Sequence, residues 1–141
     1  MAEKIITPEI AASLREAFKD LKDEVSLHAF VRPGENEEFN KVLVELVTEM
    51  AELHPKIKAR VHGIGHEDSR RYDVQRSPTL LISPEKYKLR YTGAPAGEEG
   101  RTFVGAILMA SGGRGFLDQA LARRVASLRQ QRDIKVFVSP T

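Results

Sequence analysis

The chain has 141 residues, 41% of them hydrophobic and 30% charged, which is typical of one globular domain. Its 22 basic residues are interleaved with 20 acidic ones and the net charge is +2, so no field of one sign is available to bind nucleic acid. The apolar runs fall far short of the about 20 residues that cross a bilayer, and no basic-then-apolar leader opens the sequence. We therefore expect a cytoplasmic protein that binds neither nucleic acid nor membranes.

The amino-terminal part predicts a helix and then a buried strand. Thr7 is a typical N-cap, Pro8 suits the first helical position, and Glu9 complements the helix dipole. Apolar residues then recur at helical spacing, at Ile10, Leu14, Ala17, Phe18 and Leu21. The apolar run 25–31 is closed by Arg-Pro-Gly, a pattern typical of a strand buried on both faces.

The clearest periodicity lies between residues 38 and 53. One stripe at 3.6-residue spacing holds Phe39, Val42, Leu43, Leu46, Val47, Met50 and Leu53. Charged side chains face away from it, so we predict a helix that packs on a sheet. His54 and Pro55 end this helix, residues 57–62 alternate as a second strand, and residues 68–72 predict one helical turn.

A hairpin and another helix follow. Residues 79–82 and 88–92 flank a turn-forming Ser-Pro-Glu-Lys, which predicts two antiparallel strands. A helix that carries Phe103, Ile107 and Ala110 then ends at the glycine pair 112–113.

The carboxy-terminal part predicts a last helix and a strand. The helix is expected over 116–129, with Leu117, Leu121, Val125 and Leu128 on one face. The strand is expected over 134–141, where it would leave an unpaired edge, which natural domains usually avoid. We therefore expect the native polypeptide to continue beyond Thr141, and a chain that ends there to form a homodimer or to leave this strand disordered.

Three stretches of the sequence resemble a known family: 76–82, which runs Arg-Ser-Pro-Thr-Leu-Leu-Ile, 91–99, and 103–113. Together with the order of elements they resemble the thioredoxin fold. Within it, the chain is similar to the N-terminal domain of the flavoprotein subunit of bacterial alkyl hydroperoxide reductase, and to the first half of the tandem-thioredoxin protein disulfide oxidoreductases. The resemblance implies an α/β fold with a four-stranded mixed sheet flanked by helices, plus an extra C-terminal helix and strand.

The resemblance also implies a division of the chain and a function. Residues 1–113 would form a cysteine-less thioredoxin-like domain, 114–133 a connecting helix, and 134–141 the first strand of a second thioredoxin-like fold that carries Cys-x-x-Cys. This chain has no cysteine, and a thiolate is the nucleophile of disulfide exchange. It would therefore be a redox-inactive module, without a cofactor of its own, that scaffolds and tunes the neighbouring domain.

The parent protein would be a disulfide oxidoreductase that acts in redox homeostasis. If it is of the flavoprotein kind, FAD and NAD(P)H would supply electrons to the Cys-x-x-Cys pair, and a peroxiredoxin would receive them. If it is of the tandem kind, no flavin is attached. A different class of function is a free-standing adaptor, without catalysis, that binds proteins by adding a strand to the edge of its sheet.

The family's site residues fall on Pro78, Thr79 and Glu99. Pro78 matches the cis-proline, which with Thr79 faces the substrate or partner in active relatives; without cysteines nearby, we expect an architectural role. The family's Gly-x-Glu-Phe is here Gly97 to Gly100, with glycine in place of phenylalanine. Glu99 would support acid or base chemistry at the neighbouring thiols, although adjacent Glu98 leaves open which carboxyl matches. The alternative is that both are helix N-terminal carboxylates.

In redox-active relatives the cysteines lie between the first strand and the long helix. Here Glu35, Glu37 and Glu38 occupy that segment, and we expect them in the first turn of the helix, where they stabilise its dipole.

Other motifs predict less. His62, His66, Glu67 and Asp68 have metal-ligand chemistry, but the glycines between the histidines favour a solvated loop. The glycines at 63–65 and 112–115 do not match a nucleotide-binding loop. The arginine pairs 70–71 and 123–124 could contact an acidic partner, but interleaved acids favour solvated surface.

Overall fold

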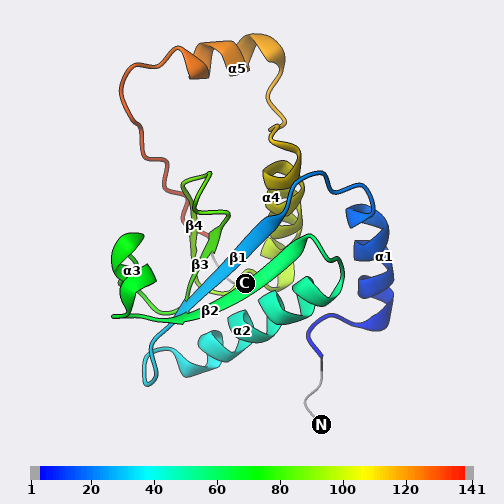
Figure 1. Cartoon of the computed structure of the whole chain (residues 1–141), viewed down its shortest axis with the longest axis vertical. Helices are drawn as coiled ribbons and strands as arrows, with labels where there is room; N and C mark the ends of the chain where they lie inside the picture. The colour runs from blue at the N-terminus through cyan, green and yellow to red at the C-terminus, as the bar shows by residue number, and fades with distance from the viewer. Residues whose placement is uncertain (1–3, 139–141) are drawn as a thin grey trace.

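A four-stranded mixed sheet forms the centre of the computed structural model, which describes residues 4–138 (Figure 1). The elements in chain order are α1 (Pro8–Phe18), β1 (Val25–Val31), α2 (Glu37–Glu52), β2 (Ile57–Gly63), α3 (Glu67–Arg71), β3 (Thr79–Ile82), β4 (Leu89–Thr92), a 3₁₀ turn η1 (Gly97–Glu99), α4 (Gly100–Gly112) and α5 (Gln119–Ala126). The predicted fold class is confirmed.

The strand order is β2-β1-β3-β4. β1 pairs in parallel with β2, and antiparallel with β3, which continues into β4 as the predicted hairpin. Six of the seven residues of β1 are buried, as expected for a central strand whose residues are apolar on both faces.

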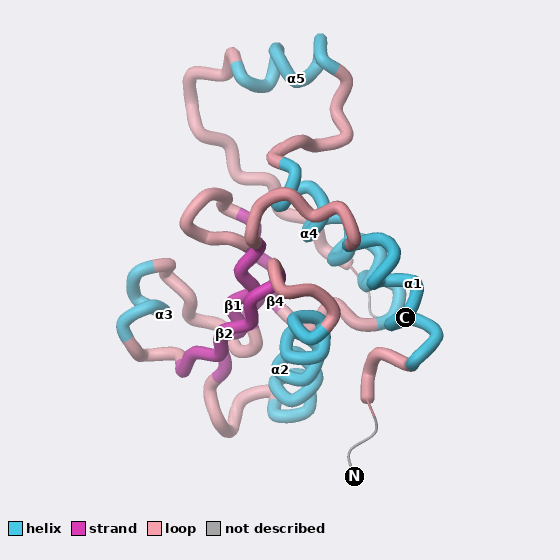
Figure 2. Tube along the Cα trace, turned by 45° about the vertical axis from the view of Figure 1, so that its right-hand side comes forward, coloured by secondary structure: helices cyan, strands magenta, loops and turns pink. Residues whose placement is uncertain are grey.

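The two faces of the sheet are covered very differently (Figure 2). One face packs against α1, α2 and α4, and the main core combines Leu27 and Leu80 of the sheet with Phe18, Leu43 and Ile107 of these helices. The opposite face is covered by α3 and the segment that follows it, through a small cluster of Phe30, Val74 and Leu81. Phe30, His28 and Ser26 alternate along β1 and point to this second face.

The start of α2 differs from the predicted stripe. Phe39 was expected in the core but is 52% exposed, whereas Asn40, which was not predicted, is buried at 6%. Asn40 aligns along the helix with Leu43, Val47 and Met50, which are all buried. The reason is that the first turn of α2 faces a polar loop, where carbonyl groups require hydrogen-bond donors, rather than the apolar sheet.

The start of α1 follows the prediction, but the buried part of the helix is shorter than the predicted apolar stripe. The Thr7 hydroxyl accepts a hydrogen bond from the Ile10 amide at 3.4 Å, as expected of an N-cap. Ile10 is 49% exposed, whereas Phe18 at the end of the helix is fully buried. The helix therefore packs on the core most closely at its carboxy-terminal end, with Ala11 and Leu14 only partly buried against it.

Residues 114–138, here called the C-terminal arm, run from the end of α4 out to α5, which lies away from the sheet, and then turn back toward the hairpin (Figure 1), where Lys88 donates a hydrogen bond to Gln131 at 3.0 Å. Every residue of the arm is exposed. Its helix is shorter than the predicted 116–129 and begins at the N-cap Asp118, whose carboxylate accepts a hydrogen bond from the Leu121 amide at 2.8 Å.

The strand predicted over 134–141 is not formed over 134–138, which have no regular secondary structure. The reason is that no other strand lies beside this segment to complete its hydrogen bonds. Residues 139–141 lie outside the described part of the chain. The longest helix among residues 4–138 is α2, with 16 residues, and none there is long and apolar enough to cross a membrane.

Candidate functional site

The segment where redox-active relatives carry cysteines lies between β1 and α2, against the loop that contains Ser77 and Pro78. The Ser77–Pro78 peptide bond is cis. The Arg32 amide donates to the Ser77 hydroxyl at 2.7 Å, and that hydroxyl donates to Asn40 Oδ1 at 2.7 Å. Asn40 Nδ2 donates in turn to the carbonyls of Arg32 and Glu35, at 3.1 and 2.7 Å. Asn36 Nδ2 donates to the Ser77 carbonyl at 2.8 Å.

These hydrogen bonds, here called the Ser77–Asn40 network, join three segments that are far apart in the sequence. Within residues 4–138, no buried side-chain nitrogen or oxygen lacks a hydrogen-bond partner. Redox-active relatives carry a thiol pair at this place. Here the network fills it with neutral polar groups whose buried side-chain atoms are all hydrogen-bonded. Such a set is structural, because none of its groups is left free to bind or react.

Pro78 and Thr79, which match residues that face the substrate or partner in active relatives, both have buried side chains here. Thr79 is 1% exposed, and its hydroxyl donates to the Arg76 carbonyl at 2.6 Å. The Pro78 carbonyl accepts a hydrogen bond from Gly93 at 2.9 Å. Neither side chain is therefore accessible in the described part of the chain.

Two groups can be distinguished among the three carboxylates between β1 and the first turn of α2, which are Glu35, Glu37 and Glu38. Glu37 and Glu38 lie in the first turn of α2, as predicted, and Glu37 accepts a hydrogen bond from the Gly34 amide. Glu35 precedes the helix and pairs with Arg32 at 2.7 Å instead. The helix N-cap is Asn36, in the left-handed conformation at φ 51°.

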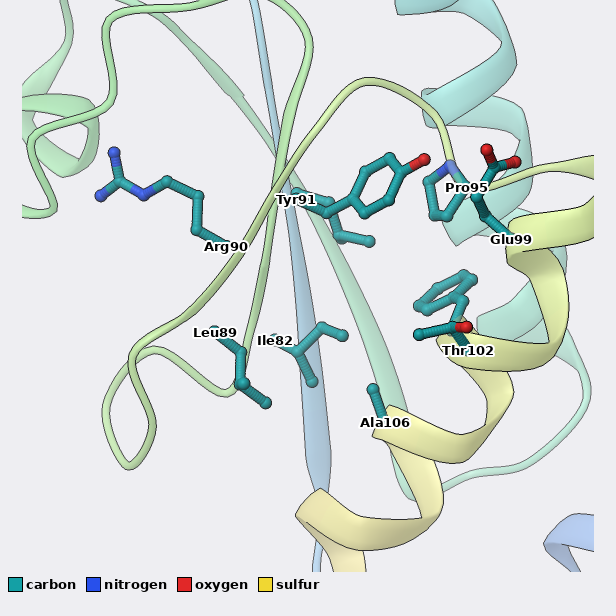
Figure 3. Close-up of a pocket in the computed structure, with 10 residues that line it drawn as sticks. Ile82, Leu89, Arg90, Tyr91, Pro95, Glu99, Thr102 and Ala106 are labelled. Carbon is teal, nitrogen blue, oxygen red and sulfur yellow. The ribbon is translucent and has the colours of Figure 1, made fainter. Parts of the chain in front are cut away.

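A second candidate site is a cavity of about 160 Å³ between the β3–β4 hairpin and α4 (Figure 3). Leu80, Ile82 and Phe103 contribute to an apolar wall. Tyr91 and Glu99 supply the polar groups, and in the figure the tyrosine hydroxyl points to the side where Pro95 and the Glu99 carboxylate lie.

Glu99, rather than Glu98, is the carboxyl that lines this cavity. Glu99 is half-buried at the end of η1, whereas Glu98 is exposed. Burial raises the pKa of the Tyr91 hydroxyl above its usual value, and the negative charge of Glu99 raises it further. The Glu99 carboxylate therefore acts electrostatically on the tyrosine of this cavity. Its acid or base role stays a prediction.

The histidines were predicted to lie in a solvated loop, and His66 does. His62 does not, because its ring faces His28 of β1 and Asp68 of α3. No group of three metal-ligating side chains gathers anywhere in residues 4–138.

Sequence reasoning missed Asn40, Ser77 and His28. Of these three, only Asn40 could have been found from the sequence, because it lies on the same face of the predicted helix as Leu43 and Val47. Ser77 and His28 find their partners across 37 and 34 residues, which no local pattern can indicate.

The chain is similar to solved structures of two kinds. A protein disulfide oxidoreductase from Aeropyrum pernix K1 is 24% identical, with a TM-score of 0.76 over 91% of this chain and 56% of that one. The alkylhydroperoxide reductase AhpF from Enterococcus faecalis V583 is 21% identical, with a TM-score of 0.75 over 87% and 61%. Its isolated N-terminal domain is 20% identical, with a TM-score of 0.76 over 88% and 61%.

These likenesses confirm a thioredoxin-like fold of the kind that the sequence resemblance implied. The chain spans less than two thirds of the length of each of these structures. No protein-family model matches the chain, and no curated protein matches it by sequence.

Proposed function

We propose that this chain is a thiol-free thioredoxin-like module that holds and positions an adjacent Cys-x-x-Cys domain in a disulfide oxidoreductase. The observation that carries the proposal is the C-terminal arm, whose apolar side chains have no cover from the rest of the described chain. The most exposed are Phe116, Ile134 and Phe137, at 83%, 89% and 91%. Large apolar side chains exposed together in this way indicate a contact site.

The arm is suited to contact another domain along its whole length. Leu117, Leu121, Val125 and Leu128 recur at helical spacing, and all are at least 41% exposed. The segment 134–138 is apolar apart from Lys135 and rich in β-branched residues, which is typical of a strand. A helix and a strand-like segment with uncovered apolar side chains are what we expect of a connection over 114–133 and of a second thioredoxin-like fold that begins at residue 134.

The Ser77–Asn40 network supports a scaffold role over the free-standing adaptor. In active thioredoxin-like proteins the cis-proline loop presents a backbone edge to the substrate. Here the Ser77 carbonyl, the Pro78 carbonyl and the Arg32 amide are all engaged within the chain. An adaptor that bound a peptide along the backbone of the cis-proline loop would first have to break those hydrogen bonds. Each of them contributes about 1 kcal/mol to the stability of the fold.

The parent protein would pass electrons to the Cys-x-x-Cys pair and then to a peroxiredoxin or to protein disulfides, in the cytoplasm. A flavoprotein parent would draw these electrons from NAD(P)H through FAD. No residue of this chain is assigned to either cofactor, so they would bind elsewhere in the parent.

The test begins with the reading frame beyond Thr141, which we expect to encode Cys-x-x-Cys within a few residues. In that longer polypeptide, Leu121→Lys combined with Val125→Lys should speed amide exchange in α5 by about tenfold or more, because two charges would replace apolar contacts. Gln119→Lys, on the opposite side of α5, is the control and should leave exchange unchanged. A continuation without the motif, or equal exchange in both variants, would contradict the proposal.

Glu99 is proposed to tune the neighbouring thiols, and Glu99→Gln tests this. In the present chain the variant should lower the pKa of Tyr91, which stays above its usual value because burial is the larger cause. In the longer polypeptide it should shift the pH dependence of thiol alkylation. Ultraviolet titration of tyrosine and alkylation rates measure the two effects. Glu98→Gln, at an exposed site, should change neither; an unaltered thiol profile in Glu99→Gln would refute the role.

A further inference from the structure

Three side chains form a line beneath α3, on the face of the sheet away from the main core. His28 Nδ1 of β1 lies 2.9 Å from His62 Nε2 of β2. His62 Nδ1 lies 3.3 Å from Asp68 Oδ2 of α3. His28 is only 7% exposed, and the His62 ring stacks on Phe30 with 4.8 Å between ring centroids. Both rings are therefore held in place by packing.

The arrangement of the two histidine rings is that of one proton shared between two nitrogens, rather than that of a metal site. The two imidazole rings are within 14° of parallel and their centroids are 5.0 Å apart, so the facing nitrogens lie close to the line between the ring centres. An N–H···N hydrogen bond requires this arrangement. Two nitrogens that bind one metal ion would instead point toward a common third position.

We propose that Asp68, His62 and His28 form a proton-dependent clasp that holds α3 on the sheet and loosens it when the histidine pair takes up a second proton. In the neutral state, His28 Nδ1–H donates to His62 Nε2, and His62 Nδ1–H donates to Asp68. A first proton enters at His28 Nε2, and the shared proton moves to His62 Nε2. The positive charge then lies beside the Asp68 carboxylate, and both hydrogen bonds remain.

A second proton has only one place to bind, the lone pair of His28 Nδ1. It would place two N–H groups against each other and two positive rings side by side, so the contact between β1 and β2 at this point is lost. The α3 segment is affected because Asp68 holds it to His62, and Tyr72, directly after α3, packs edge-on against His28 with 6.2 Å between centroids.

The charges around the pair favour an uncharged His28. Burial lowers the pKa of His28 below its usual value, as does the neighbouring His62 and, more weakly, Arg60 of β2; Glu85 of the β3–β4 turn and Asp68 oppose the shift. A histidine whose pKa is lowered on folding contributes stability above the unfolded-state pKa, and this contribution is lost as the pH falls below about 6.5. The clasp should therefore loosen as the pH falls from about 6.5 through the lowered pKa of His28.

Loosening is expected to be local, because other contacts of α3 do not involve the histidines. The Ser69 hydroxyl accepts a hydrogen bond from the Gly65 amide at 2.8 Å, and Arg90 of β4 donates to the Asp73 carbonyl at 2.7 Å.

The test uses the full 141-residue chain. Nitrogen-detected NMR should show the His28 Nδ1 and His62 Nε2 signals changing together as the pH falls, as expected of two nitrogens that share one proton. After correction for intrinsic exchange, the Tyr72 and Val74 amides should exchange about tenfold faster at pH 5 than at pH 7.5. His62→Gln, which cannot titrate, should remove this pH dependence. His66→Gln, at an exposed histidine beside α3, should retain it.

If His62→Gln does not fold, His28→Asn serves instead, because its amide can donate at the Nδ1 position without taking up a proton. Independent titration of the two rings at ordinary values would overturn the clasp. So would exchange that is insensitive to pH, or an equal effect of His66→Gln. Micromolar Co²⁺ that broadens both imidazole signals would show a metal site in its place.

Discussion

Asn40→Leu is expected to lower the free energy of unfolding by about 2–4 kcal/mol, since several partners in the Ser77–Asn40 network lose their hydrogen bonds together. Asn40 is buried, accepts from the Ser77 hydroxyl, and donates to the carbonyls of Arg32 and Glu35. Leucine has the same branching at Cγ but can replace none of these hydrogen bonds. Urea unfolding followed by circular dichroism measures the change.

Lys41→Leu is the matched control for this experiment, because it places the same side chain one residue further along α2 at an exposed position. Its effect should stay within about 0.5 kcal/mol. If the two variants unfold at the same urea concentration, the network is not what stabilises this loop, and the structural interpretation of the segment between β1 and α2 fails.

Ile107→Ala is expected to cost about 2–5 kcal/mol, the range for a large aliphatic side chain removed from a packed core. Ile107 is fully buried on the side of α4 that faces the sheet, in the main core with Leu27 and Leu80. The cost combines the lost transfer free energy with the cavity that remains. Thermal and urea unfolding of the 141-residue chain measure it.

Leu108→Ala tests whether the effect belongs to burial rather than to helix propensity. Leu108 is the next residue of the same helix but is 36% exposed, so we expect a loss below about 1 kcal/mol. Similar losses of unfolding free energy in both variants would mean that α4 does not close the core in the way described. They would also mean that the C-terminal arm contributes to the stability of the domain that precedes it.

The elements that the sequence predicted best are those that depend on local chemistry. β1 was predicted with its observed bounds, because a short apolar run closed by proline and glycine has few alternatives. The hairpin was predicted because its turn residues lie between two β-forming runs. Thr7 was identified as an N-cap because a hydroxyl before Pro8 has an evident partner within one helical turn.

The errors all concern groups whose environment is built by distant residues. Phe39 was placed in the core because its spacing fits the stripe, but the first turn of α2 faces the loop of Ser77. Residues 134–138 have the pattern of a strand, but a strand forms only where a neighbour completes its hydrogen bonds.

By itself, the sequence determined the order of helices and strands, the likeness to the thioredoxin fold, and the absence of any thiol for disulfide exchange. Only the tertiary structure decided that Asn40 closes the loop, that Glu99 rather than Glu98 lines the cavity, and that His28 lies against His62 and Asp68. The physical reason is range: caps, turns and periodicity act over a few residues, whereas burial and hydrogen bonding depend on which distant segments the fold brings together.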